Sequence, residues 1–235
     1  MNEDLIEKYL EIRRTMVPTI NPLKSALLII DMQKYQVRKE WSIYKFLNSS
    51  FPGFLDYFVK QVSEVVEPNI KRLVNFFREN DMKIVYTLLS SRNKDGSDFT
   101  RQIRTINEIA KEQIGDFIYP HKDHPGSKII DSIKPEDDDL VLIKTTSGAF
   151  SSTNLGLFLQ NMGIEILFIV GVATSMCVGS TARVASDLGF DVIIIEDACA
   201  DWSPEFHKNS LRSFERIYGS VMSTEEVIKK IKEKE

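Results

Sequence analysis

The sequence predicts an α/β fold in which helices cover both faces of one central parallel sheet. Short apolar runs of strand length alternate along the chain with longer segments that carry apolar residues at helical spacing. The runs are rich in Ile, Leu and Val without a polar alternation, which is typical of strands buried on both faces. These runs are residues 25–33, 83–90, 139–144, 164–170 and 191–197.

Length and composition favour a single domain. The 235 residues are 43% hydrophobic, enough for one sizeable core. The 30 basic and 34 acidic side chains give a net charge of −4 without a basic stripe, so no nucleic-acid partner is expected. Residues 1–14 are too charged for a secretory signal, and no run approaches the roughly 20 apolar residues of a membrane span. Two cysteines in core-like segments favour a reducing compartment, so we expect a cytoplasmic protein.

The first part of the chain divides into an arm, a strand and an aromatic segment. Residues 5–16 show helical spacing and end at the prolines of "VPTINP", so we expect an N-terminal helical arm over residues 1–20 and one domain over residues 21–235. Residues 34–60 are rich in aromatic side chains but show no clean period. We interpret them as a long loop, a candidate lid.

The remaining elements follow from caps and periodicity. A helix is expected from Pro68, where proline suits a first turn. The polar residues 90–112 and the Pro-rich stretch "YPHKDHPGS" give no element. Further helices are expected within 151–163, after 171–182 and near 204–217, and Ser223 with Glu226 opens the last one as a capping box.

Three chemically reactive side chains stand where predicted strands end. Asp31 ends the first strand, Lys144 ends the third, and Cys177 follows the fourth after a short connection. Each type is often structural on its own: a turn aspartate, a solvated lysine or a small buried thiol. Because open parallel sheets bind ligands at the carboxyl ends of their strands, the three side chains are expected to meet at one edge.

This combination suits nucleophilic catalysis by a thiol. A thiol pKa of about 8.5 can be lowered by a nearby ammonium and a helix N-terminus, here Lys144 and the amides after Thr174. Asp31 can take the thiol proton and return it to a leaving amine. The small residues of "GVATSMC" allow backbone amides to face an oxyanion, although a close strand-to-helix crossing would need the same small residues.

The chain resembles the isochorismatase-like cysteine hydrolases. The resemblance runs from Ser25 to Val227 through "LLIIDMQ", "YT" at 86–87, "GSD" at 96–98, "IKTTSGAFSSTNL", "GVATSMCVGSTARVASDLGFDVIIIEDACAD", His207 and "GSVMSTEEV". It implies a Rossmann-like three-layer αβα sandwich with catalytic Asp31, Lys144 and Cys177. It also implies a cis peptide at Val172–Ala173 and an oxyanion hole formed by the N–H groups of Ala173 and Cys177. The family is commonly homo-oligomeric, so a dimer or tetramer is expected, with the N-terminal arm taking part in assembly.

The same resemblance bears on metals and cofactors. Members that hydrolyse nicotinamide bind a metal through an acidic residue and two histidines after the first two strands, but this chain has no histidine before His121. We therefore expect no metal, and we interpret His121 and His124 as part of a surface turn. No G-x-G-x-x-G follows a strand, so no cofactor is expected. Cys199 is expected to be structural.

The predicted function is hydrolysis of a C–N bond in a small amide, ureide or N-carbamoyl substrate through an acyl-cysteine intermediate. Alternatives are an isochorismatase-type vinyl ether hydrolase, which needs a proton donor but no nucleophile, and a non-catalytic oligomeric partner or thiol sensor. Arginines of the polar stretches could hold a substrate carboxylate; the candidates are Arg92, Arg101 and Arg104. The candidate pocket residues are Gln33, Trp41, Thr145, Phe150 and Met176.

Overall fold

The strands form one parallel six-stranded sheet in the order β3-β2-β1-β4-β5-β6. The computed structural model describes residues 3–233. The strands are β1 (Ser25–Ile30), β2 (Lys83–Leu89), β3 (Leu140–Lys144), β4 (Ile166–Val172), β5 (Asp191–Ala200) and β6 (Ser220–Met222). The chain builds outward from β1 to β3 and then returns to the other side of β1 at β4, so the strand order reverses between β1 and β4. Ligands of open α/β sheets bind at such a reversal.

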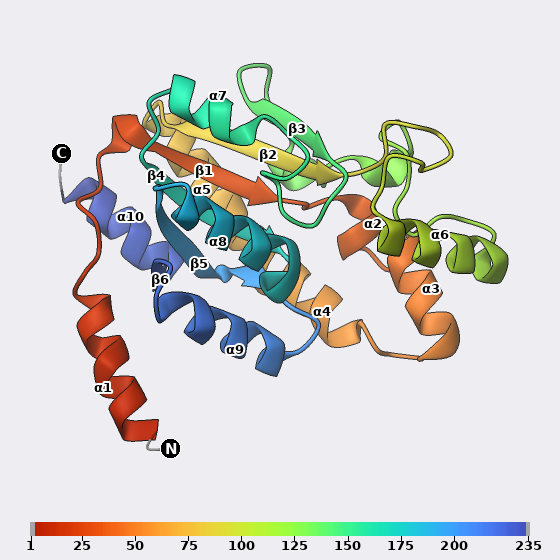
Figure 1. Cartoon of the computed structure of the whole chain (residues 1–235), viewed down its shortest axis with the longest axis horizontal. Coiled ribbons are helices and arrows are strands. Elements are labelled where there is room, and N and C mark those ends of the chain that lie inside the picture. The colour runs from red at the N-terminus through yellow and green to blue at the C-terminus, as the bar shows by residue number, and fades with distance from the viewer. Residues whose placement is uncertain (1–2, 234–235) are drawn as a thin grey trace.

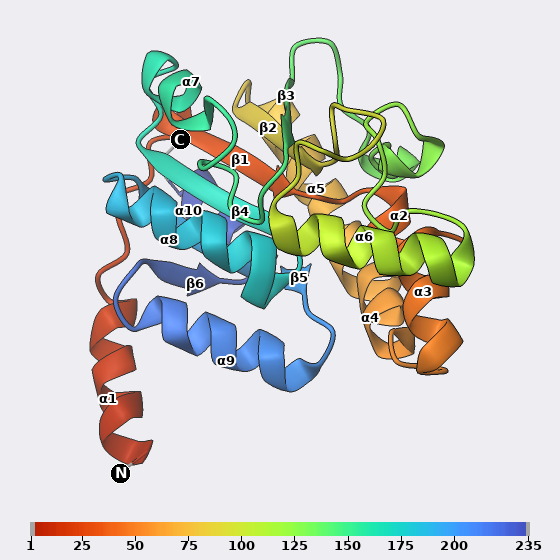
Figure 2. The same ribbon diagram turned by 45° about the vertical axis from the view of Figure 1, so that its right-hand side comes forward.

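Helices cover both faces of the sheet, which confirms the predicted three-layer αβα sandwich. One face carries α7 (Leu155–Asn161), α8 (Gly179–Asp187) and α9 (Pro204–Glu215), and the opposite face carries α5 (Glu67–Glu79) and α10 (Thr224–Lys232) (Figures 1 and 2). Short 3-10 helices lie at Pro22–Lys24, Pro125–Ser127 and Asp131–Ile133, and π-helical segments lie at Val62–Val66 and Thr174–Val178.

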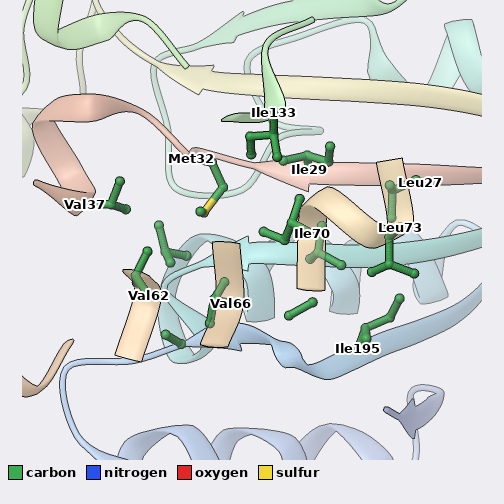
Figure 3. Packing of buried hydrophobic residues seen from close by; sticks show 14 of the residues in the cluster. Leu27, Ile29, Met32, Val37, Val62, Val66, Ile70, Leu73, Ile133 and Ile195 are labelled. Atoms are coloured by element: carbon green, nitrogen blue, oxygen red, sulfur yellow. The ribbon is translucent and has the colours of Figure 1, made fainter. Parts of the chain in front are cut away.

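Alternate residues of β1 fill two separate apolar layers. Leu27 and Ile29 pack with Ile70 and Leu73 of α5 (Figure 3), whereas Leu28 and neighbouring side chains pack toward α7 and α8. These β1 side chains are fully buried. Burial of one such side chain contributes about 1.5–3 kcal/mol. The two layers therefore fix the position of β1 at the centre of the sheet.

The N-terminal helix α1 (Glu3–Arg14) lies outside the sandwich, beside α9 and β6 (Figure 1). Arg14 forms an ion pair with Glu215 at 2.9 Å, and the Tyr9 hydroxyl donates to the carbonyl of Arg216 at 2.9 Å. Leu10 is buried. Within residues 3–233, no helix is both long enough and apolar enough to cross a membrane.

The prediction of a long loop over residues 34–60 is wrong. The segment forms α2 (Lys34–Val37), α3 (Ser42–Ser50) and α4 (Asp56–Gln61), which gather with other helices at the carboxyl end of the sheet (Figure 1). The helices are short and separated by turns, so no single period runs through the segment. A candidate lid in the form of an open loop is therefore not present within these described residues.

Two further elements have weak sequence signals. Helix α6 (Arg101–Ile114) is polar because it buries only Asn107 and Ala110; Thr100 caps its start, and Gly115 ends it with a φ of 76°. Strand β6 is three residues long, too short for a hydrophobic pattern. The capping box of Ser223 and Glu226 at the start of α10 is confirmed.

Gly171 is required where β4 passes β1. Its φ is 114°, and a Cβ atom at this position would lie 2.1 Å from the carbonyl oxygen of Ile30. Ile30 precedes Asp31 and pairs with Gly171 across the two strands. A side chain at position 171 would therefore displace the strand end that carries Asp31.

We predict that Gly171→Ala destabilises the protein by more than about 3 kcal/mol. The new Cβ atom would overlap with backbone atoms of Ile30, and the positive φ is itself unfavourable for alanine. Urea denaturation measures the loss. Gly163→Ala is the matched control: its φ is 69° and nothing lies within 4 Å of a new Cβ, so only the φ cost of about 1 kcal/mol is expected. Equal losses in the two variants would contradict the prediction.

Candidate active site

The carboxyl ends of three strands bring Asp31, Lys144 and Cys177 together. Asp31 follows β1, Lys144 ends β3, and Cys177 lies in the π-helical turn Thr174–Val178 after β4. The Nζ atom of Lys144 lies 2.7 Å from Asp31 Oδ2 and 3.4 Å from Cys177 Sγ. All three side chains are buried, and Asp31 and Lys144 are completely so. The Lys144 ammonium therefore contacts both the Asp31 carboxylate and the Cys177 thiol.

The protons of the Lys144 ammonium are fully engaged. Nζ donates to the carbonyl oxygens of Thr146 at 3.0 Å and Ser147 at 2.9 Å. An ammonium has three protons, so two of them hold these carbonyls and one remains for Asp31 and Cys177. Burial by itself lowers the pKa of Lys144, but the neighbouring Asp31 and Cys177 keep that pKa above its ordinary value. Lys144 is therefore charged at neutral pH.

Asp31 is held in an unusual backbone conformation. Its φ is 52°, a left-handed value that is uncommon for a residue other than glycine. Thr87 of β2 fixes it twice: the Thr87 carbonyl accepts from the Asp31 N–H at 3.1 Å, and the Thr87 hydroxyl donates to Oδ1 at 3.0 Å. Such conformations cost about 1–3 kcal/mol and persist where neighbours enforce them. The hydrogen bonds of Thr87 direct the other carboxylate oxygen toward Lys144.

The thiol pKa shifts opposite to the direction we expected. The pKa of Cys177 is raised to about 12: burial is the largest cause, the Lys144 ammonium lowers the pKa, and the Asp31 carboxylate raises it. The expectation of a lowered pKa is therefore wrong, because it took account of the cation and the helix terminus without burial and the carboxylate. At rest the site holds a neutral thiol beside a carboxylate and an ammonium.

A second set of polar contacts fixes the turn that carries Cys177. The Val172–Ala173 peptide bond, which precedes the turn, is cis. Asp201, at the end of β5, accepts from the Ser175 N–H at 2.6 Å. The Thr174 hydroxyl lies 2.8 Å from His207 Nδ1, and burial lowers the pKa of His207. Asp201 is a site residue that was not predicted from the sequence, although its place after an apolar strand is the same signal that identified Asp31.

A cavity of about 100 Å³ reaches the thiol. Its lining includes Cys177, Ala173, Met176, Tyr119 and Trp202. The two residues expected to form an oxyanion hole, Ala173 and Cys177, thus lie at this cavity. Of the expected pocket residues, Met176 is part of the lining.

The other four expected pocket residues have different surroundings. Gln33 is fully buried behind the site, where its amide donates to Ser127 O at 2.9 Å and accepts from the Leu89 N–H at 2.8 Å. The Thr145 N–H donates to Ser152. The ring of Trp41 packs edge-on against His124, and that of Phe150 packs against Phe190. Gln33, Trp41, Thr145 and Phe150 therefore lie outside the lining of this cavity, and their contact with a substrate stays a prediction.

The remaining candidates also have structural partners. His121 Nε2 lies 3.0 Å from Arg92 O, and His124 Nδ1 accepts from the Gly126 N–H at 3.1 Å. Cys199 is buried, with Sγ 3.8 Å from the Ile169 carbonyl. In the described part of the chain, the cavity lining includes none of the three candidate arginines.

Comparisons with known proteins identify the family. Residues 25–226 match the model of the isochorismatase domain, so the chain belongs to the isochorismatase family and is a hydrolase. It is 31% identical over 209 residues to the uncharacterized isochorismatase family protein YwoC of Bacillus subtilis (strain 168), covering 89% of this chain and 95% of that protein. It is 30% identical over 166 residues to an N-carbamoylsarcosine amidase of Arthrobacter sp., and the match covers 70% of this chain and 61% of that protein. The crystal structure of a cysteine hydrolase from Pseudomonas syringae pv. phaseolicola 1448A shares the fold, with a TM-score of 0.77 and 23% sequence identity. The superposition covers 92% of this chain and 96% of that one.

We predict that Asp31→Asn makes Cys177 easier to alkylate, because removal of the carboxylate lowers the thiol pKa and raises the thiolate fraction. The rate of alkylation by iodoacetamide at pH 8, followed by peptide mass mapping at Cys177, should rise about tenfold or more. Asp191→Asn, at an exposed position at the start of β5, is the control and should leave the rate unchanged. A slower reaction in Asp31→Asn would contradict the assigned electrostatics.

Proposed function

We propose that this protein hydrolyses the C–N bond of a small amide, ureide or N-carbamoyl substrate through an acyl-cysteine intermediate. The observation that carries the proposal is the position of Lys144 Nζ, which lies within 2.7 Å of the Asp31 carboxylate and 3.4 Å of the Cys177 thiol. A thiol, a base for its proton and a fixed cation are the groups that acyl transfer by cysteine needs. The named activity of the Arthrobacter relative agrees with this bond type.

Attack begins with transfer of the Cys177 thiol proton to Asp31. The sulfur then bonds to the substrate carbonyl carbon, and the carbonyl oxygen becomes an oxyanion. The N–H groups of Ala173 and Cys177 stabilise this oxyanion, an interaction that can contribute about 10²–10³ in rate for each donor. Because the resting thiol is protonated, the transfer is coupled to binding and attack. The Lys144 ammonium stabilises the charge that passes between sulfur and carboxylate.

Breakdown of the tetrahedral species returns the proton. Asp31 protonates the leaving nitrogen as the C–N bond breaks, and the acyl group stays on sulfur as a thioester or thiocarbamate. Asp31, again a carboxylate, then takes a proton from water, whose oxygen attacks the acyl carbon. The C–S bond breaks, the sulfur recovers its proton from Asp31, and the product acid leaves.

We predict that Cys177→Ala and Cys177→Ser lower kcat by about 10³-fold or more, because no acyl intermediate can form on the first and the second offers a much weaker nucleophile. Ammonia release from a panel of small amides and ureides measures turnover. Intact mass spectrometry should detect an acyl adduct on the wild-type protein and none on Cys177→Ala.

Cys199→Ala is the matched control, since Cys199 is also a buried free cysteine but contacts Ile169 O instead of the cluster. It should retain turnover and adduct formation. Turnover of Cys177→Ala near the wild-type rate would contradict the proposed nucleophile. Release of pyruvate from isochorismate by that variant would assign the site to vinyl ether hydrolysis.

A further inference from the structure

We propose that the substrate is an uncharged amide or ureide whose side group is apolar, and that substrates with a carboxylate next to the reacting group are rejected. This inference rests on the proposed function and names its substrate class. The observations behind it are the apolar walls of the cavity, the uncharged polar atoms that it offers and the complete engagement of the neighbouring Lys144 ammonium.

Most of the cavity wall is apolar. Helices α3, α4 and α6, the end of strand β2, the π-helical turn Thr174–Val178 and the loop after β5 contribute side chains without polar N or O atoms or with a single indole N–H. These side chains are Ile43, Phe58, Leu89, Ile103, Met176 and Trp202. Burial of an apolar group against such a wall is favourable, whereas a charged group would lose its hydration without a replacement.

The polar groups of the lining are neutral and available to a ligand. Tyr119 lines the cavity, and its hydroxyl has no hydrogen-bond partner among residues 3–233. Its backbone is fixed by Asn107, which accepts from its N–H at 2.9 Å and donates to its carbonyl at 3.0 Å. Burial raises the pKa of Tyr119 to about 12, and the nearby Cys177 and Asp31 act in the same direction. The phenol is therefore a neutral donor at physiological pH.

Gln36 offers a neutral acceptor in the same lining. Its Nε2 donates to the Tyr35 hydroxyl at 3.2 Å and to Gln33 Oε1 at 3.4 Å. Its Oε1 has no partner within the described part of the chain and is free to accept a hydrogen bond. A neutral donor and a neutral acceptor match the carbonyl and N–H groups of an amide or ureide.

No free cation faces the cavity. The lining formed by residues 3–233 contains no Lys, Arg or His. Lys144 lies beneath it, but its protons serve Thr146 O, Ser147 O, Asp31 and Cys177. A substrate carboxylate would lie unpaired near the Asp31 carboxylate, which would disfavour binding by repulsion as well as by desolvation.

The size of the cavity agrees with a small substrate. Its volume is about 100 Å³, small beside the roughly 300–1,000 Å³ of pockets that bind drug-sized ligands. The reacting amide and a short apolar group fill this space.

Two pairs of nearly isosteric compounds test the proposal. The first is isovaleramide against malonamate, and the second is isobutylurea against N-carbamoylglycine; each pair replaces a terminal isopropyl group by a carboxylate. Ammonia release gives kcat/KM for each compound. We expect the neutral member of a pair to exceed the charged one by about 10²-fold or more. Equal values, or a preference for the carboxylates, would overturn the proposal.

A variant at the cavity rim provides an independent test. Met176 lines the cavity and is 36% exposed, so Met176→Lys can place an ammonium there without burying it. The ratio of kcat/KM, carboxylate over neutral, should rise about tenfold in Met176→Lys and stay unchanged in the size-matched control Met176→Gln. An unchanged ratio in Met176→Lys would contradict the proposal that the missing cation determines the preference.

The two proposals fail in different ways. Turnover of the carboxylate compounds alone, with an adduct on Cys177, overturns the substrate class and leaves the proposed hydrolysis intact. Absence of both turnover and adduct with every compound of both pairs overturns the proposed function and this inference with it.

Discussion

The buried ion pair between Lys144 and Asp31 is the interaction on which the rest of the site depends. Neither side chain is exposed, and either one alone would be an uncompensated charge in a medium of low dielectric, at a cost of about 3–5 kcal/mol. The hydrogen bonds from Lys144 to the carbonyls of Thr146 and Ser147, and from Thr87 to Asp31, satisfy the remaining polar groups. The pair is therefore tolerated inside the protein, and it holds a carboxylate and a cation beside a thiol.

The parallel sheet supplies the geometry for this pair. Strand β1 lies next to both β2 and β4 at the reversal of strand order, so Asp31, Thr87 and Cys177 approach one another from neighbouring strand ends. The close passage of Gly171 along Ile30 brings the thiol-bearing turn near Asp31. Packing of the strands thus determines distances that no local sequence preference could set.

The sequence was sufficient to predict the layers of the fold and the meeting of Asp31, Lys144 and Cys177 at one edge of the sheet, because apolar runs and strand ends are local patterns. It was insufficient to predict the helices within residues 34–60, because three short helices in succession share no common hydrophobic period. It also gave the wrong direction for the pKa of Cys177, since burial and the proximity of Asp31 arise only in the folded protein. Tyr119 was not predicted as a site residue for the same reason. The sequence around it indicates a loop, and only the fold places this residue at the cavity.

The coupling between Lys144 and Asp31 is tested most directly by a double-mutant cycle on the free energy of unfolding, with Lys144→Met, Asp31→Asn and the double variant. If the two charges compensate each other, each single change leaves the other unpaired, and the double change costs less than the sum of the single changes by about 2 kcal/mol or more. Additive losses would contradict the account, because they would mean that the two side chains act independently.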